Sequence, residues 1–170
     1  MTEKQQHFSF KNLTLISSIM KTFEILLVED NEGDIILTTE SLEDSKLIKN
    51  INVVKNGKDA VDFVMKKGSY IMANRPDLIL LDVNLPLKNG YEVLKIIKNN
   101  EKTKQIPVIM LTTSSSEDDV NLSIANHANA FITKPIEPED YSNIRTKVEN
   151  FLLKMNSVKI NKKTTLLSDN

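Results

Sequence analysis

Short apolar runs alternate with amphipathic segments along most of this chain. Three runs, beginning near residues 24, 77 and 107, are almost wholly apolar and end in polar residues. Uninterrupted runs of this kind, bounded by Pro, Gly or acidic residues, are typical of strands that are buried on both faces of a sheet. Two further runs, near residues 51 and 130, are shorter and more mixed. The pattern therefore predicts three central strands and two edge strands.

The segments between these runs carry apolar residues at helical spacing. The expected helices end near Asp44 and Gly68, follow Gly90, begin at Ser116 and begin near Pro138. Ser116 and Asp119 match a capping box, in which each end of the motif satisfies a free amide of the first helical turn. Five strands that alternate with helices imply a parallel sheet with helices on both faces.

Placing the three most apolar strands in the middle gives the strand order 2-1-3-4-5. We therefore predict an α/β fold, a flavodoxin-like doubly wound five-stranded parallel sheet, over residues 23–155. Residues 1–22 have no convincing helix or strand period, so they are interpreted as an N-terminal extension, and residues 156–170 as a loose polar C-terminal tail. An open alternative is that translation starts at Met20 and that residues 1–19 are not native.

The composition excludes several classes of function. The 170 residues, 40% apolar and 26% charged, fit one domain with a proper core. The 22 basic and 23 acidic side chains give a net charge of -1, so no global field favours nucleic acid or a membrane surface. The absence of cysteine excludes disulfides and thiolate catalysis. No apolar stretch is long enough to cross a bilayer, and no secretory signal is evident, so we expect a cytoplasmic protein.

Chemically coherent side chains follow four of the predicted strands: Glu29 with Asp30, then Asp82, Thr112 and Lys134. The carboxyl ends of parallel strands meet at one edge of a sheet, so we expect these groups to lie together. Three carboxylates at close range resist ionisation unless they bind a cation, and oxygen ligands suit Mg²⁺. A carboxylate beside Mg²⁺ can attack phosphorus, while an ammonium and a hydroxyl offset charge on the transferring group. The sequence therefore predicts a Mg²⁺ site at this edge, where Asp82 is the carboxylate expected to carry the function and could act as a nucleophile toward phosphorus.

Four motifs stand at the predicted strand ends: Val-Glu-Asp at residues 28–30, Leu-Leu-Asp-Val-Asn-Leu-Pro-Leu-Lys-Asn-Gly at 80–90, Met-Leu-Thr-Thr at 110–113 and Phe-Ile-Thr-Lys-Pro at 131–135. In this order and spacing they resemble the receiver domain of two-component response regulators. The resemblance covers about residues 23–155. The first and last motifs, the Leu-Thr-Thr strand end and the longer loop over residues 68–76 are most similar to the regulators partnered with bacterial phytochromes.

The resemblance implies a role for each residue of the acidic edge. Asp82 would be the phosphorylated residue and Asp30 would bind Mg²⁺ directly or through water. Glu29 would assist through water, with a plain solvated acid as an equal alternative. Asn84 would supply its backbone carbonyl to the metal.

The resemblance also implies a conformational switch. Thr112 would be the switch hydroxyl and Lys134 the phosphate-binding lysine, before a cis peptide bond to Pro135. Phe131 stands where the family has its switch aromatic, which would swing inward as Thr112 moves; an ordinary core role is the alternative. One departure is Thr113, where many receivers have Ala and where a branched side chain would narrow access to the site.

The resemblance implies a single-domain response regulator that takes a phosphoryl group from a sensor histidine kinase, for instance a phytochrome-type kinase, and is not itself an enzyme. Little chain follows the last predicted helix, so output is expected through a downstream protein, a phosphotransfer protein or a homodimer. An alternative is a Mg²⁺-dependent phosphohydrolase, which commonly needs a second carboxylate where this chain has Asn84. A second alternative is a receiver-like interaction module that works without phosphorylation. His127 is expected to cap a helix C-terminus and not to accept phosphate.

Overall fold

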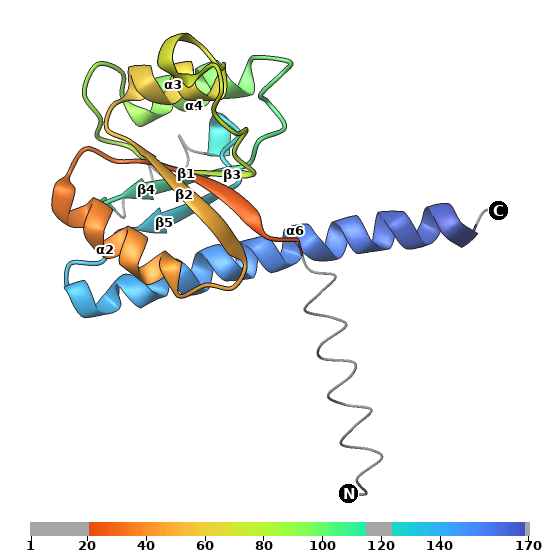
Figure 1. The fold of residues 1–170 in the computed structure, drawn as a ribbon. Helices are drawn as coiled ribbons and strands as arrows, with labels where there is room; N and C mark the ends of the chain where they lie inside the picture. Colours follow the sequence, from red (N-terminus) through yellow and green to blue (C-terminus); the bar gives the residue numbers. More distant parts are fainter. Residues whose placement is uncertain (1–20, 115–123, 169–170) are drawn as a thin grey trace, which may run out of the picture.

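The structure, a computed structural model, describes residues 21–114 and 124–168, with only the backbone described beyond residue 157. It contains a five-stranded parallel sheet in the order β2-β1-β3-β4-β5, as predicted (Figure 1). The strands are β1 (Phe23–Val28), β2 (Ile48–Val54), β3 (Leu78–Asp82), β4 (Val108–Thr112) and β5 (Ala130–Thr133). The flavodoxin-like strand order is therefore confirmed.

Burial separates the central strands from the edge strands as the apolar pattern predicts. Every residue of β3 and β4 is buried, whereas β2 and β5 alternate between partly buried, exposed and buried positions. The parallel register pairs Asp82 with Leu111 and Thr112 with Thr133. Consequently β3, β4 and β5 end at the same edge of the sheet.

Four described helices cover the two faces of the sheet. They are α2 (Glu32–Glu43), α3 (Gly57–Val64), α4 (Gly90–Lys98) and α6 (Ser142–Ser168), with short 3-10 helices η1 (Gly68–Tyr70) and η2 (Pro138–Tyr141). Helices α3 and α4 lie on one face, and α2 and α6 lie on the other (Figure 1). Asparagine side chains at residues 31, 56 and 89 cap α2, α3 and α4 by accepting a hydrogen bond from the first turn.

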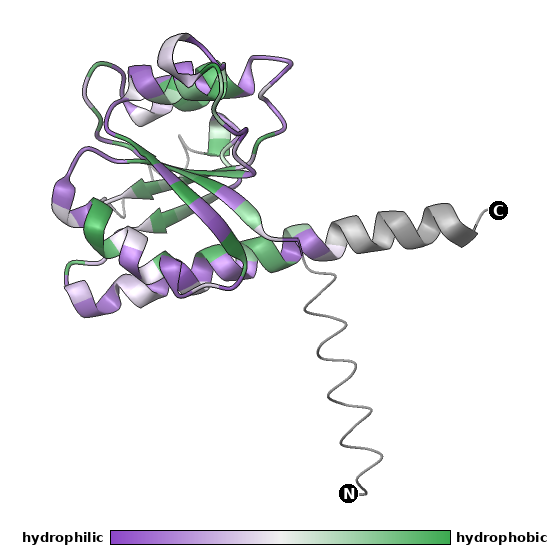
Figure 2. Cartoon of the chain, viewed as in Figure 1, coloured by the Kyte–Doolittle hydropathy of each residue, from purple (hydrophilic) through white to green (hydrophobic). Residues whose placement is uncertain are grey.

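The alternation of side chains along each strand divides the core into two clusters. Leu26 and Ile79 point into the cluster under α3 and α4, while Leu27 and Leu80 point into the cluster under α2 and α6. All four side chains are fully buried, and each contributes about 1.5–3 kcal/mol through removal of apolar surface from water. Figure 2 shows β4 and β5 as largely apolar, whereas α2 and α6 mix apolar and polar residues. The sheet is therefore packed on both faces and carries the site residues at its carboxyl edge.

Some predicted boundaries were wrong. Helix α6 extends to Ser168, so the residues expected to form a loose tail from 156 onward are helical over most of their length (Figure 1). The chain from Ser142 to Ser168 contains neither Pro nor Gly, so nothing in it stops a helix once one has started. Helix α3 ends at Val64, before the predicted end at Gly68.

Two predictions lie outside the described residues. These are the capping box at Ser116 and Asp119, and the N-terminal extension as far as residue 20. In the part of the chain that the structure describes, no helix combines the length and apolarity needed to cross a membrane.

Candidate functional site

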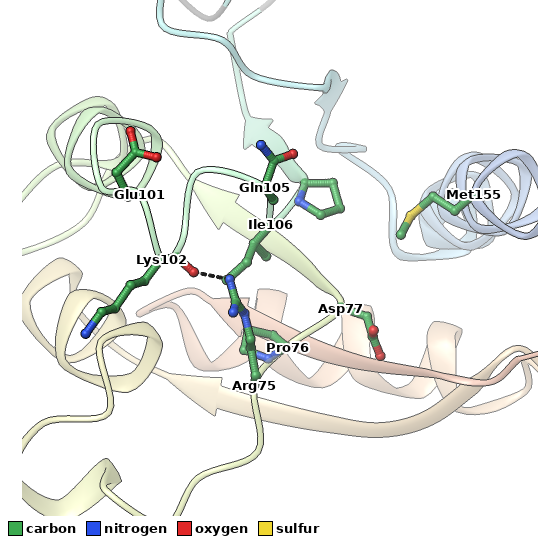
Figure 3. A pocket seen from close by; sticks show the side chains of 9 residues that line it. Arg75, Pro76, Asp77, Glu101, Lys102, Gln105, Ile106 and Met155 are labelled. Carbon is green, nitrogen blue, oxygen red and sulfur yellow. Dashed lines mark hydrogen bonds between the residues drawn. The ribbon is translucent and has the colours of Figure 1, made fainter. Parts of the chain in front are cut away.

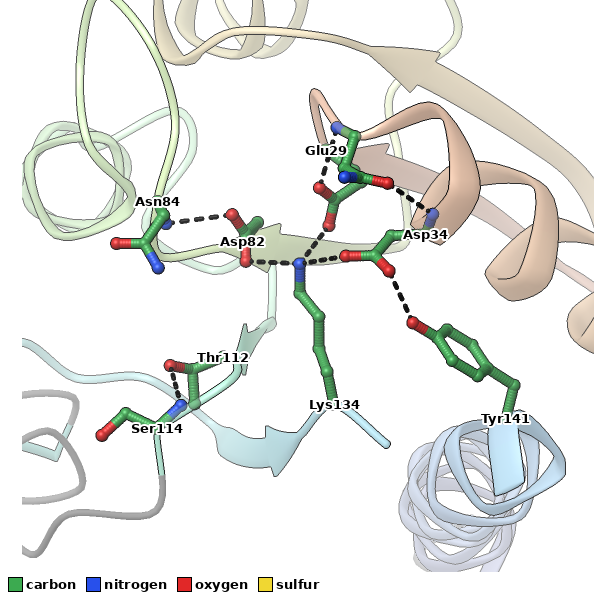
Figure 4. Close-up of polar contacts among 9 residues, drawn as sticks. Glu29, Asp34, Asp82, Asn84, Thr112, Ser114, Lys134 and Tyr141 are labelled. Carbon is green, nitrogen blue, oxygen red and sulfur yellow. Dashed lines mark hydrogen bonds and ion pairs between the residues drawn. The ribbon is translucent and has the colours of Figure 1, made fainter. Parts of the chain in front are cut away.

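The side chains predicted to share one edge of the sheet do lie together. Glu29 and Asp30 follow β1, Asp82 ends β3, Thr112 ends β4 and Lys134 follows β5. Four of these residues are buried, and Asp30 is exposed. Figure 4 shows Glu29, Asp82 and Lys134 directed toward one another from three different strands, with Thr112 beside them.

The ammonium group of Lys134 is the centre of this arrangement. Its Nζ lies 2.6 Å from Glu29 Oε2, 2.8 Å from Asp34 Oδ2 and 2.9 Å from Asp82 Oδ1. An ammonium has three hydrogens, so these three carboxylates use all of them. The Lys134 side chain is only 7% exposed, so water competes little with the three ion pairs.

Glu29, Asp30 and Asp82 form an oxygen-rich group that suits a hard cation. Each offers one carboxylate oxygen, and the three oxygens lie within 4.8 Å of one another. Two of the carboxylates are held by backbone amides: Asn31 N–H donates to Glu29 Oε1 at 3.1 Å, and Asn84 N–H donates to Asp82 Oδ2 at 3.0 Å. Mg²⁺ prefers such oxygen donors, with an exposed side left for water or phosphate, so these residues fit that ion.

The electrostatics of the group favour a bound cation. Burial raises the pKa of Asp82, and pairing with Lys134 only partly offsets this effect. Burial also raises the pKa of Glu29, where Lys134 opposes the shift and the Asp82 charge adds to it. Burial alone would lower the pKa of Lys134, but its three carboxylate partners outweigh burial and raise it. Lys134 is thus positively charged, but its one charge does not fully compensate the burial of the two carboxylates of Glu29 and Asp82.

Thr112 lies beside this network and does not join it. Its hydroxyl oxygen accepts a hydrogen bond from Ser114 N–H at 3.1 Å, and its carbonyl accepts one from Lys134 N–H at 2.6 Å. The Thr112 side chain is buried, whereas Thr113 is exposed. The structure therefore brings the predicted hydroxyl to the site, and its role as a switch stays a prediction.

The remaining predicted residues occupy three different environments. Asn84 has an exposed side chain, in keeping with a role assigned to its backbone alone. Phe131 is partly buried on β5 and packs against the core under α3 and α4. His127 has a φ of 63° and its N–H donates to the Ile124 carbonyl, which is the geometry of a helix C-terminal cap. The capping role predicted for His127 is confirmed.

Asp34 and Tyr141 belong to the site although sequence reasoning missed them. Asp34 accepts a hydrogen bond from the Tyr141 hydroxyl at 2.6 Å in addition to its ion pair with Lys134. Each also fits a common local role, since Asp34 is an acid in the first turn of α2 and Tyr141 is buried in an apolar cluster. No local signal pairs them, because they lie 107 positions apart in the sequence.

Two close backbone contacts shape the loop that follows Asp82. A Cβ on Gly90 would lie 2.2 Å from the Asp82 carbonyl oxygen, and one on Gly57 would lie 2.1 Å from the Lys88 carbonyl oxygen. Gly57 N–H also donates to the Pro86 carbonyl at 3.2 Å. Only glycine permits these approaches, so the loop is held tightly against β3 and α3.

The prediction of a cis peptide bond between Lys134 and Pro135 was wrong. The described chain contains no cis peptide bond, and this one is trans. For a bond that precedes proline the two isomers differ by only ~0.5–1 kcal/mol, so the local sequence does not decide between them.

A separate cavity of about 720 Å³ lies away from the acidic group, at the opposite edge of the sheet (Figure 3). It is lined by Arg75, Pro76, Asp77, Glu101, Lys102, Gln105, Ile106, Pro107 and Met155. The Arg75 guanidinium donates a hydrogen bond to the Lys102 carbonyl there. None of the predicted site residues lines this cavity.

Comparison with known proteins gives consistent matches. The model of the response regulator receiver domain matches residues 25–146. Response regulator Rcp1 of Synechocystis sp. is 43% identical over 129 residues, which cover 76% of this chain and 88% of that protein.

Solved structures give the same result. The crystal structure of the phosphorylated cyanobacterial phytochrome response regulator RcpA matches with a TM-score of 0.74 and 42% identity, over 79% of this chain and 96% of that one. The Mn²⁺-bound form of Rcp1 matches with a TM-score of 0.70 and 42% identity, over 76% of this chain and 93% of that one.

Proposed function

Because this chain belongs to the response regulator receiver domain family, we propose that it accepts a phosphoryl group on Asp82 from a sensor histidine kinase. The observation that carries the proposal is the arrangement around Asp82. One buried carboxylate lies at a sheet edge with two further acids within 4.8 Å and an ammonium 2.9 Å away. Such a set combines a nucleophile, a cation site and a fixed positive charge.

The transfer step follows from these groups. A carboxylate oxygen of Asp82 attacks the phosphorus of a phosphohistidine, the new P–O bond forms, and the P–N bond to the donor imidazole breaks. The electron pair stays on the imidazole nitrogen, which takes up a proton. Lys134 then lies within reach of a phosphoryl oxygen and offsets part of its charge. Asn84 N–H holds the second carboxylate oxygen of Asp82.

Mg²⁺ is the cofactor that we assign to Glu29, Asp30, Asp82 and the backbone carbonyl of Asn84. When bound, it neutralises charge on the acids and on the transferring group. The oxygen-only donor set supports the assignment, as does the Mn²⁺-bound form of the related Rcp1. Removing Glu29 or Asp82 would leave the cation with fewer charged ligands.

We assign the output to a change in protein contacts. Thr112 lies at the end of β4, and Phe131 lies on the adjacent β5, paired with Met110. A phosphoryl group on Asp82 would draw the Thr112 hydroxyl inward and allow Phe131 to follow, which shifts a two-state equilibrium. The relatives named as phytochrome response regulators support a phytochrome-type kinase as the donor. A downstream protein, a phosphotransfer protein or a second copy of the chain would receive the signal.

Intact-mass measurement after incubation with acetyl phosphate tests the proposal. The protein should gain one labile phosphoryl group when Mg²⁺ is present, and none in EDTA or in the Asp82→Ala variant. The Glu43→Gln variant is a suitable control, because Glu43 is an exposed acid at the end of α2. It should gain the phosphoryl group as the wild type does.

Two results would contradict the proposal. A gain that persists in Asp82→Ala would place the phosphate elsewhere. Steady release of phosphate without a trapped adduct would favour the phosphohydrolase instead. The structure gives a reason to expect no such turnover, because the position that supplies a second carboxylate in those enzymes is Asn84, whose amide cannot donate a proton as an acid does.

A further inference from the structure

The Lys134 ammonium is shared between two opposing carboxylates. In Figure 4, Asp82 lies on one side of Nζ and Asp34 lies on the other, with Glu29 above. The two opposing distances are nearly equal, 2.9 Å to Asp82 Oδ1 and 2.8 Å to Asp34 Oδ2. Asp34 therefore takes one of the three ammonium hydrogens away from the Asp82 side.

Asp34 is itself held in place from two directions. Its Oδ1 accepts a hydrogen bond from the Tyr141 hydroxyl at 2.6 Å, and its backbone N–H donates to Asn31 Oδ1 at 3.0 Å. Tyr141 is 5% exposed, and its carbonyl accepts a hydrogen bond from Ser41 Oγ at 2.9 Å. The η2 segment is thus fastened to α2, and the Asp34 carboxylate has little freedom to turn.

The Asp34 carboxylate is also held in its charged form. Burial alone would raise the pKa of Asp34, but the hydrogen bonds from Lys134 and Tyr141 outweigh burial and hold that pKa below its usual range. Asp34 is therefore ionised when the site works. It adds a negative charge beside the place where an anionic phosphoryl group would sit, in a site where Lys134 is only 7% exposed and screening by water is weak.

We propose that Asp34 and Tyr141 are positioning residues that hold the Lys134 ammonium back from Asp82, and that they thereby limit how tightly a phosphoryl group is bound. This inference rests on the proposed function. A phosphoryl group needs donors on the Asp82 side, and Lys134 can give it a second hydrogen only by leaving Asp34 or Glu29. Of these two partners, Asp34 lies opposite Asp82 and holds the ammonium away from it. Tyr141 acts one step further away, because its hydroxyl keeps the Asp34 carboxylate aimed at Lys134.

Beryllofluoride, a tetrahedral analogue of a carboxyl-bound phosphoryl group, provides an equilibrium test. Its affinity for the Mg²⁺-loaded protein can be measured by titration with ¹⁹F NMR. Asp34→Asn should bind on the order of tenfold more tightly than the wild type, which corresponds to ~1.4 kcal/mol. Tyr141→Phe should show a smaller gain, because Asp34 keeps its charge and only loses its fixed orientation. Glu40→Gln removes an exposed charge from the same helix and should bind as the wild type does.

A double-variant comparison separates positioning from a structural role. If Asp34 acts through Lys134, Asp34→Asn should give no gain in a Lys134→Ala background. In the metal-free protein without beryllofluoride, the ¹⁵Nζ signal of Lys134 should shift in Asp34→Asn and in Tyr141→Phe. A merely structural role for Asp34 would weaken binding, or leave it unchanged, in both backgrounds.

The outcomes also separate this inference from the proposed function. Wild-type protein that binds no beryllofluoride in Mg²⁺ would contradict the proposed function, and this inference with it. Wild-type binding together with equal or weaker binding by Asp34→Asn would overturn the inference alone. A gain that survives in the Lys134→Ala background would also overturn it, because the effect would not pass through Lys134.

Discussion

Replacing Asp82 with asparagine is expected to stabilise the metal-free protein, although it removes the residue on which the proposed chemistry depends. Asp82 has oxygens of Glu29 and Asp30 within 4.8 Å and Lys134 Nζ at 2.9 Å. At an effective dielectric constant near 20, each repulsion costs ~3 kcal/mol and the attraction contributes ~6 kcal/mol. These Coulomb energies nearly cancel.

The cost of burying the charge then decides the sign. The Asp82 side chain is 3% exposed, so its carboxylate has lost nearly all contact with water. Asparagine keeps the shape and can still accept the hydrogen bond from Asn84 N–H without this charge. We expect a gain of ~2 kcal/mol in the free energy of unfolding, or roughly 4–8 °C in Tm for a chain of this size.

Thermal unfolding in EDTA, followed by circular dichroism, measures this gain. Adding Mg²⁺ should then raise the Tm of the wild type, because an ion at 100 times its Kd contributes ~2.7 kcal/mol, and should raise that of Asp82→Asn much less. Glu43→Gln is the matched control and should melt like the wild type under both conditions. An Asp82→Asn variant that melts at or below the wild-type temperature in EDTA would refute the reasoning.

Three further predictions concern pH, the loop after Asp82 and the half-buried amine of Lys98. Burial raises the pKa of Asp82, so as the pH falls the folded protein takes up a proton at this residue before the unfolded chain does, and the wild type gains stability. The Tm advantage of Asp82→Asn in EDTA should therefore narrow as the pH falls through that raised pKa toward 3.8, the ordinary value. A Tm difference that stays constant over this range would contradict the prediction. Gly90→Ala should lower the free energy of unfolding, measured in urea, by roughly 2–4 kcal/mol, because its Cβ would meet a backbone oxygen at 2.2 Å. In the control variant Gly33→Ala the Cβ would meet only a side-chain oxygen at 3.2 Å, so the free energy of unfolding should change by less than ~1 kcal/mol. Lys98 Nζ donates hydrogen bonds of 2.9 Å to the Ile106 carbonyl before β4 and to Asn129 Oδ1 before β5. Lys98→Met should therefore lower the free energy of unfolding by ~1–3 kcal/mol in the same assay, whereas Lys95→Met, at an exposed position, should leave it unchanged.

The central strands and the acidic edge were predictable because their signals are local. The runs that became β3 and β4 are apolar at every position that had to be buried, and each ends at the residue that reaches the site. Parallel strands of this kind can only bring Asp82, Thr112 and Lys134 to one edge. Sequence order and chain direction were sufficient to place them.

The contact between Asp34 and Tyr141 was not predictable, because it depends on how η2 and α6 pack against α2. The two residues are 107 positions apart, and each also fits a common local role. The length of α6 was missed for a different reason. Residues 156–168 are mainly polar, and a polar composition alone does not distinguish a helix from a loose tail.

The cis isomer predicted for the peptide bond before Pro135 was wrong because that prediction came from the resemblance to a family and not from the residues of this chain. A difference of ~0.5–1 kcal/mol between isomers leaves the outcome to tertiary contacts. Here the Lys134 N–H donates to the Thr112 carbonyl while the Lys134 ammonium reaches three acids. Those contacts are made with the bond in trans.

Chemical reduction of the phosphorylated protein tests most directly whether Asp82 carries the phosphoryl group. Borohydride reduces an acyl phosphate to an alcohol, so a phosphorylated aspartate becomes homoserine, and peptide mass spectrometry identifies its position. After incubation with acetyl phosphate and Mg²⁺, we predict homoserine at residue 82 and unchanged aspartate at residues 30 and 34. Homoserine at either of those positions, or none in a protein that has gained phosphate, would contradict the account.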